Sequence, residues 1–250
     1  MEINFFISIA YTTDICLYVI SLVTHLLKCN GISRAVALFA VWVNGALLAV
    51  MAVTSGHLPV FNLFESLMLS TFVLGGLGVF RHSKKGSPWG VRAWVWLLAL
   101  FLMGITLFFP KEASSYRPDS TFLWVVLFHG LRCLALGTGL FAAAHFILFR
   151  FGSGAPEKTL FRMGRNYLLV TTVLFLCSEY AGMIWCQRGW GDFWHWSGTF
   201  FQSALIILCL MFAFHIPGKT RLSENTRSIS GIVAVLIMLA VKISKGMWMV

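Results

Sequence analysis

The chain has 250 residues, of which 58% are hydrophobic and only 11% are charged, whereas soluble domains carry about 25% charged residues. This composition excludes an ordinary soluble enzyme. The net charge of +10 does not indicate a nucleic-acid-binding protein, because the basic residues stand between apolar segments and not on one face of a soluble module. The sequence therefore predicts an integral membrane protein without a nucleic-acid partner.

Eight apolar segments follow one another along the chain, each long enough to cross a bilayer. Helices are expected, because a segment in lipid must pair its own backbone N–H and C=O groups. We expect one all-α, polytopic membrane domain over residues 1–250, with about eight transmembrane helices and a first helix that is retained. The predicted segments are 4–27, 35–54, 60–80, 91–109, 121–150, 166–186, 199–216 and 229–249.

The basic residues alternate between the connections, and this alternation predicts the orientation of the chain. The first, third, fifth and seventh connections with their edges hold thirteen Lys and Arg, against three in the other connections. Because loops rich in Lys and Arg stay cytoplasmic, both termini and the loops 55–59, 110–120 and 187–198 are expected on the outer face. Lys242 and Lys245, near the C-terminus, run against this bias.

A tryptophan-rich outer loop is predicted over residues 185–201. Four of the ten tryptophans lie within twelve residues there, at Trp185, Trp190, Trp194 and Trp196. One interpretation is a belt of aromatic rings at the headgroup level. The other is a platform on which a flat hydrophobic ligand stacks, with Arg188 beside it to pair with a carboxylate.

The order of residues in this loop resembles a known signature. The heptapeptide 190–196, W-G-D-F-W-H-W, is similar to the W-G-x-[FY]-W-x-W (WWD-type) signature of the haem-handling proteins of cytochrome c biogenesis, which include CcsA (ResC), CcmC, CcmF and HemX-like proteins. The segment 55–67, S-G-H-L-P-V-F-N-L-F-E-S-L, resembles the G-H-x-P-x-x-N-[LY]-[YF]-E-S-L segment of the CcsA branch. Both motifs fall on loops predicted to lie on the same outer face.

The chain departs from the family pattern directly after the tryptophans. The family signature continues with Asp-Pro-Lys-Glu and soon another Trp, whereas Ser197, Gly198, Thr199 and Phe200 follow here and Gln202 takes the later Trp position. The function of that acidic continuation must be absent or be performed differently.

The resemblance implies a protein that carries haem b and delivers it across the bacterial cytoplasmic membrane for covalent attachment to apocytochrome c. The partners it implies are a CcsB-like (ResB-like) membrane subunit, an apocytochrome with C-x-x-C-H and thiol-reducing proteins, with the tryptophan loop on the periplasmic side. Haem would stack on Trp190, Trp194 and Trp196, with Phe193 and Arg188 as further contacts. No hydrolytic or redox motif is present, so the chain alone is not expected to be an enzyme.

Three other functions stay open. A HemX-like accessory or regulatory protein without haem export shares the tryptophan signature. A b-type electron-transfer subunit needs two axial histidines that converge; His129 and His145 differ by about 160° around an ideal helix, which weakens that interpretation. A transporter predicts internal repeats, and no convincing repeat is found.

The histidines are the expected haem ligands. His129 lies about eight residues inside the fifth predicted helix and matches the outward-facing ligand of the family; a satisfied core histidine is the alternative. His215 ends the seventh helix and matches the transmembrane ligand of the family; a histidine that meets water and headgroups is the alternative. No histidine follows it, so the second outer ligand of the family is missing. Either His129 has a different partner, for which His57 and His195 are the available substitutes, or the protein no longer ligates haem in the usual way. For His57 and His195 the alternative is a surface or interfacial residue.

Buried charges are expected to face the bundle interior and find partners. Arg132 shares the helix face of His129 to within about 60° and could meet a haem propionate; an ion pair with Glu65 or Glu179 is the alternative. Glu65, with Asn62, is expected to have an architectural role. Gly191 is the expected structural glycine of the tryptophan motif.

Overall fold

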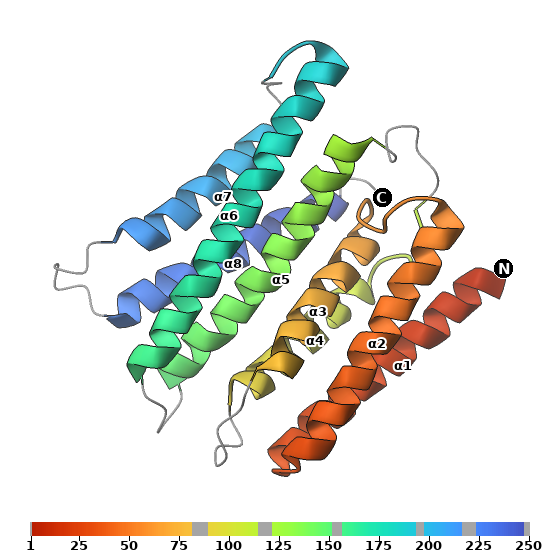
Figure 1. The fold of residues 1–250 in the computed structure, drawn as a ribbon, viewed down its shortest axis with the longest axis vertical. Coiled ribbons are helices and arrows are strands. Elements are labelled where there is room, and N and C mark those ends of the chain that lie inside the picture. Colours follow the sequence, from red (N-terminus) through yellow and green to blue (C-terminus); the bar gives the residue numbers. More distant parts are fainter. Residues whose placement is uncertain are drawn as a thin grey trace. The chain divides into compact units, whose positions relative to one another are not determined.

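A computed structural model describes residues 2–81, 90–114, 122–151, 157–193, 198–216 and 224–247. In these residues the chain forms eight α-helices and no β-strand (Figure 1). The all-α fold predicted from the sequence is confirmed. The helices are α1 (Glu2–Leu26), α2 (Asn30–Ser55), α3 (Leu63–Phe80), α4 (Val91–Thr106), α5 (Leu123–Phe151), α6 (Glu157–Trp190), α7 (Gly198–His215) and α8 (Glu224–Met247).

Most of these helices have the length and composition of membrane spans. Among the described residues, six helices are long and apolar enough to cross a bilayer, whereas α4 and the described part of α7 are shorter apolar helices. Large apolar side chains remain exposed along them, such as Phe5, Trp42 and Phe212. A hydrocarbon environment makes that exposure favourable, and the chain is a polytopic all-α membrane protein.

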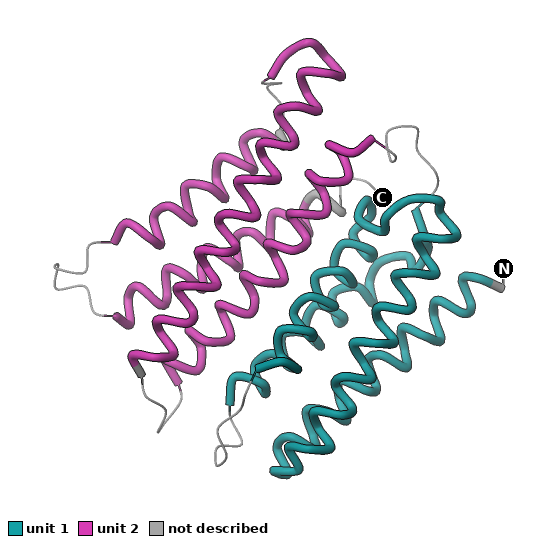
Figure 2. The backbone as a smooth tube through the Cα atoms, in the orientation of Figure 1, with its two compact units in different colours: residues 1–117 teal, residues 118–250 magenta. Residues whose placement is uncertain are grey.

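The sequence predicts one domain, and the helices form two compact units (Figure 2). In unit 1, Met1–Arg117, α1 packs against α2 and α4, α2 against α3, and α3 against α4. In unit 2, Pro118–Val250, α5 packs against α6 and α8, and α7 lies mainly against α8. Every residue from 135 to 146 of α5 is buried, so α5 forms the core of unit 2.

The helix α6 differs most from its predicted boundaries. Its 34 residues extend about 50 Å at 1.5 Å per residue, whereas the hydrocarbon core measures about 30 Å. Its first turns carry exposed Lys158, Arg162 and Arg165, so hydropathy alone does not detect them. At the other end Trp185 and Trp190 belong to the helix. The predicted loop 185–201 is therefore corrected to a shorter connection, 191–197.

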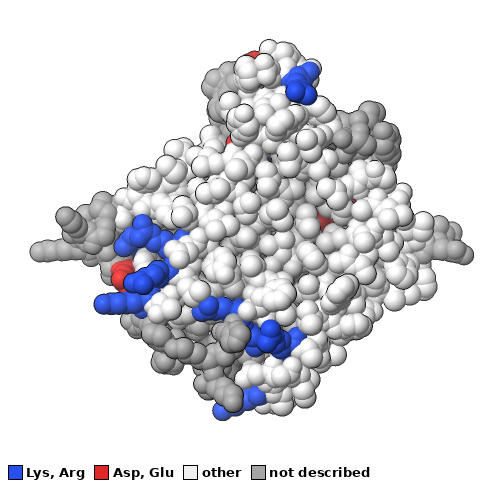
Figure 3. Space-filling model, viewed as in Figure 1, with Lys and Arg blue, Asp and Glu red and all other residues white. Residues whose placement is uncertain are grey.

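Most of the described basic residues gather at one end of each unit. In unit 1 they include Arg34 at the start of α2 and Arg92 at the start of α4; in unit 2 they include Arg150 at the end of α5 and Arg162 in α6. Figure 3 shows the Lys and Arg atoms (blue) in groups, with a largely white surface elsewhere in this view. This arrangement is typical of a membrane protein whose basic ends lie in the cytoplasm.

Candidate functional site

The first part of the tryptophan motif ends α6. Gly191 has φ +74°, and its N–H donates to the Gln187 carbonyl oxygen at 2.9 Å. Glycine adopts this left-handed conformation without a steric penalty, so the motif glycine terminates the helix directly after Trp190. The exposed fractions of Trp190 and Phe193 are 56% and 51%. Trp194, His195 and Trp196 lie outside the described residues.

His129 lies beside this helix end. The α5–α6 aromatic cluster consists of Phe128 and His129 from α5 and of Trp185 and Trp190 from α6. The centroid of the His129 ring lies 6.3 Å from that of Trp185, and Trp185 lies 5.6 Å from Trp190. His129 is half-buried, and its ring contacts those of Phe128 and Trp185. The structure thus brings a predicted haem ligand next to the tryptophan motif.

A glycine lets the two helices of the cluster approach closely. A Cβ atom on Gly182 would lie 2.7 Å from Cδ2 of Phe128, too close for any residue larger than glycine. Phe128 therefore packs directly against the α6 backbone, and its ring also lies 5.8 Å from Trp185. This packing fixes the part of α5 that carries His129.

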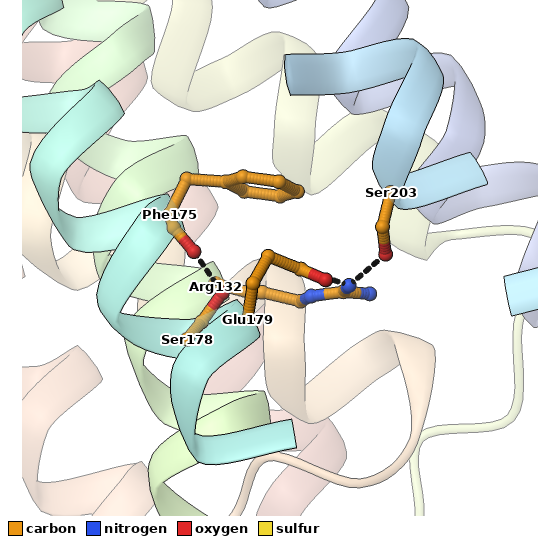
Figure 4. Close-up of polar contacts among 5 residues, drawn as sticks. All are labelled: Arg132, Phe175, Ser178, Glu179 and Ser203. Carbon is orange, nitrogen blue, oxygen red and sulfur yellow. Dashed lines mark hydrogen bonds and ion pairs between the residues drawn. The ribbon is translucent and has the colours of Figure 1, made fainter. Parts of the chain in front are cut away.

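Arg132 occupies a polar bridge one turn below His129 (Figure 4). Its Nη2 donates to Oε1 of Glu179 on α6 and to Oγ of Ser203 on α7. The guanidinium also lies 4.0 Å from the centroid of Phe128. Of the alternatives that the sequence leaves open, the structure has the ion pair with Glu179.

Arg188 stands at the same end of unit 2. It is exposed on the last turn of α6, and its guanidinium lies 6.0 Å from the centroid of Phe122, directly before α5. This position leaves the charge accessible to an anionic group that approaches the cluster.

His215 lies at the opposite end of unit 2, at the rim of a pocket. The pocket has a volume of about 910 Å³ and opens between α7 and α8, within the range of about 300–1,000 Å³ typical of sites for small molecules and cofactors. Its lining is almost wholly apolar and includes Leu208, Phe212, Ile229 and Val233.

The hydrogen bond of His215 determines which ring nitrogen can bind a ligand. Nδ1 lies 2.8 Å from the Met211 carbonyl oxygen. Because a carbonyl only accepts, Nδ1 carries the proton of the neutral ring and Nε2 keeps its lone pair. An exposed imidazole of this tautomer, beside an apolar pocket, is suited to ligate iron.

His145 belongs to the core of unit 2. It is buried, its Nδ1 lies 2.8 Å from the Phe141 carbonyl oxygen, and its ring stacks on Tyr167 of α6. Both His129 and His145 thus meet α6, although the sequence places them on opposite sides of α5. The two histidines contact different rings of α6, Trp185 for His129 and Tyr167 for His145.

The second motif forms the start of α3. The Asn62 side chain accepts from the Glu65 N–H at 2.7 Å, and Glu65 Oε2 accepts from the N–H groups of Phe61 and Asn62 at 3.0 and 3.4 Å. This reciprocal arrangement is a capping box. It satisfies backbone donors that would otherwise be unpaired at the helix start.

The same motif holds the connection after α4. Oε1 of the fully buried Glu65 accepts from the N–H and the hydroxyl of Ser114, both at 2.7 Å. Nδ2 of Asn62 donates to the Glu112 carbonyl oxygen at 2.9 Å. The ring nitrogens of buried His57 lie 3.0 Å from the Leu58 carbonyl oxygen and 3.4 Å from Ser114 Oγ. In unit 1 the motif therefore has a structural role: it holds the connection after α4 by hydrogen bonds. Both ring nitrogens of His57 lie close to oxygen atoms of this arrangement.

Some residues of these sites have no signal in the sequence. Ser114 and Ser203 are single hydroxyls in segments without a motif, and only their three-dimensional neighbours reveal them. Phe128 could have been inferred from its position beside His129. Among the described residues, no group of three or more His, Cys, Asp or Glu side chains could hold a metal ion.

Comparison with known proteins gives one distant relative. No protein-family model matches the chain. The chain is similar to Protein NrfI of Wolinella succinogenes, with 27% identity over 192 residues, which cover 72% of this chain and 21% of that protein. The chain thus spans about a fifth of the length of this relative. The similarity fits the cytochrome c biogenesis family, to which the two sequence motifs also point.

Proposed function

We propose that this chain handles haem during cytochrome c maturation. The observation that carries the proposal is the α5–α6 aromatic cluster, where His129 lies against Trp185 and Trp185 against Trp190 of the tryptophan motif. An imidazole supplies an axial ligand for haem iron, and indole rings stack on a flat macrocycle. Exposed Arg188 is placed to pair with a propionate at the same helix end.

A second haem contact is proposed at His215. The tautomer set by Met211 presents Nε2 as a ligand, and the adjacent pocket has the size and apolar lining that a porphyrin requires. About 25 Å separates His215 from the start of α7 at 1.5 Å per residue. Two such sites at opposite ends of unit 2 suit a cargo that crosses the membrane.

In this proposal the chain resides in the bacterial cytoplasmic membrane with the tryptophan motif on the periplasmic side. A CcsB-like subunit would complete the inner site, and the acceptor would be an apocytochrome c kept reduced by thiol-reducing proteins. Haem supplies the vinyl groups that the two C-x-x-C-H thiols attack. The contribution of this chain is to hold and orient haem by His129, His215 and the aromatic rings.

A second candidate is a HemX-like accessory or regulatory role without haem delivery. One specific observation favours it: Ser197 to Phe200 replace the acidic continuation of the family signature. This protein would keep the cluster and bind haem without passing it to an apocytochrome.

Haem occupancy tests the ligand assignment. The full chain is purified from membranes, with and without a CcsB-like subunit, and its reduced-haem absorption spectrum is recorded. His129→Gln should lower occupancy roughly tenfold or more, since the axial bond is lost while the side chain keeps similar length. His145→Gln is the matched control on the same helix and should keep most of the haem. Absence of haem from both preparations, or equal losses in the two variants, would overturn the proposal.

Covalent attachment separates the two candidate functions. The chain is co-expressed with the CcsB-like subunit and a reporter apocytochrome, and haem that survives denaturing electrophoresis is stained. Delivery predicts a covalent c-type product that His129→Gln diminishes. Bound haem without any covalent product would support the accessory role and contradict delivery.

A further inference from the structure

The buried face of α1 is polar. The buried positions recur every three or four residues and form one stripe along the helix: Ile7, Tyr11, Asp14, Tyr18, Ser21 and His25. The five polar members of this stripe, from Tyr11 to His25, are called the polar file here. The other faces expose large apolar side chains such as Phe5, Ile9 and Val23. Polar residues on the buried face and apolar residues on the exposed faces are typical of a membrane helix that separates a polar interior from lipid.

The polar file is hydrogen-bonded to neighbouring helices on both sides of its centre. At one end the Tyr11 hydroxyl donates to the Met103 carbonyl oxygen at 2.5 Å and lies 2.8 Å from the Thr106 hydroxyl. Towards the other end Ser21 Oγ donates to the Ser33 carbonyl oxygen at 3.0 Å, and Ser33 Oγ donates to the Ser21 carbonyl oxygen at 2.7 Å. The packing of α1 against α4 and α2 is therefore well defined on either side of the centre.

The centre of the file contains polar groups that the protein leaves unpaired. Neither carboxyl oxygen of fully buried Asp14 has a hydrogen-bond partner in the part of the chain that the structure describes. Asn44 of α2 lies close to this carboxyl and is fully buried, and its amide makes no hydrogen bond of standard geometry in the described residues. The same is true of the Tyr18 hydroxyl, which packs so closely on Gly75 that a Cβ there would lie 2.2 Å away.

In the described residues no charged side chain pairs with Asp14. It is the thirteenth of the 25 residues of α1 and thus lies at mid-helix. The helices packed against α1 carry one basic residue each, Arg34 in α2 and Arg92 in α4, both in the first turns of their helices. His25 is eleven residues from Asp14, about 16 Å along the helix. Lys111 lies over the Tyr11 ring, 5.5 Å from its centroid, and forms no ion pair with Asp14.

We propose that Asp14 is a proton-binding site in the membrane interior, with Asn44 as the group that hydrogen-bonds to the protonated carboxyl. An isolated carboxylate in a low-dielectric site is strongly disfavoured and neutralises. A carboxylic acid matches the amide opposite it, because its O–H donates to the amide oxygen and its carbonyl accepts from the amide N–H. Sodium or calcium would need more oxygen ligands than Asn44 and Tyr18 add.

Infrared spectroscopy of the full chain in lipid tests this proposal directly. The protonated carboxyl should give its carbonyl stretching band at neutral pH, and the band should shift on exchange into heavy water. Asp14→Asn, which is isosteric with the acid, should abolish the band. The matched control is Glu179→Gln, which should leave it unchanged, since Glu179 pairs with Arg132 as a carboxylate.

Isotope labelling makes the test independent of any variant. Carboxyl-labelled aspartate should shift the band in the unaltered chain, and labelled glutamate should not. Absence of the band, its shift by labelled glutamate, or its loss on adding sodium ions at constant pH would overturn the proton site. The proposal involves unit 1 alone and needs no haem, so its failure leaves the proposed haem function untouched.

Discussion

At the scale of single residues, the second motif shows how a family signature can encode architecture. Asn62 and Glu65 stand three residues apart because a capping box needs that spacing. Glu65 then uses its remaining oxygen for Ser114, so one carboxylate joins the start of α3 to the connection after α4. A ligand role for His57 is disfavoured, since its nitrogens already meet Leu58 and Ser114.

Replacing Glu65 should therefore destabilise unit 1 without a direct effect on haem. In Glu65→Gln an amide N–H₂ replaces one carboxylate oxygen and faces groups that themselves donate. The charge-assisted hydrogen bonds are lost, and the free energy of unfolding should fall by about 2 kcal/mol. Thermal unfolding in detergent should show a fall in melting temperature on the order of 5 °C. The matched control is Glu112→Gln, since Glu112 is exposed on the connection that Glu65 holds. Equal melting temperatures for the two variants would contradict the capping role.

Sequence spacing predicted part of this site and missed the rest for a physical reason. The three-residue step from Asn62 to Glu65 is a local pattern, so its architectural role could be expected. Ser114 is 49 residues away in sequence from Glu65, and nothing in its surroundings distinguishes it from other serines. For Arg132, the sequence offered Glu65 and Glu179 as acidic partners because both fall inside apolar segments, and only packing distinguishes them.

At the scale of helices, one polar bridge links three elements of unit 2. Arg132 on α5 joins Glu179 on α6 to Ser203 on α7 (Figure 4). α7 otherwise lies mainly against α8 and less against α6. The bridge thus connects the helix that carries His215 to the helices that carry the aromatic cluster. In lipid, such hydrogen bonds help to hold helices together where no hydrophobic force drives their association.

A double-mutant cycle should separate the structural role of Arg132 from a role in binding haem. Arg132→Met and Glu179→Leu should each lower stability by about 2 kcal/mol, since each leaves one charge without its partner in a largely buried site. The double variant should regain most of that loss. Melting temperature and haem occupancy are measured on the same preparations.

The two readouts distinguish the interpretations that the sequence left open. Full occupancy in the stable double variant would mean that Arg132 acts through the helix bridge alone. Low occupancy at restored stability would mean that the guanidinium also meets a propionate. Additive losses in the double variant would contradict the ion pair as the source of stability.

The helix boundaries show where hydropathy fails at this scale. All eight apolar segments are helical, and α3 and α7 begin and end within a few residues of the prediction. The start of α6 was missed because Lys158, Arg162 and Arg165 are exposed, so the helix continues without an apolar signal. Its end was missed because tryptophans suit both a loop and the last turns of a helix, and Gly191 determines which of the two forms.

At the scale of the whole molecule, the distribution of basic residues predicts the same membrane orientation for each unit. Each unit has an even number of helices, four in the described chain, with its basic end where the second and fourth helices begin. Each unit has this basic end on its own, because basic residues alternate between successive short connections within the unit. The connection that carries the Glu65 motif and the end of α6 with Trp190 are thus predicted on the same side of the membrane, opposite the basic ends.

Cysteine accessibility should reveal this orientation separately for each unit. Every described cysteine is free, so all six are first changed to serine. Single cysteines then replace Glu112 and Gly189 near the expected outer ends, or Gly31 and Thr159 near the basic ends, without removing a basic residue. In intact cells a membrane-impermeant maleimide should label Glu112→Cys and Gly189→Cys. Gly31→Cys and Thr159→Cys should react only after permeabilisation, because ends rich in Lys and Arg are expected in the cytoplasm. Labelling of Glu112→Cys and Gly189→Cys from opposite sides would contradict the alternation of helices, and labelling of both only from inside would place the tryptophan motif away from any periplasmic apocytochrome.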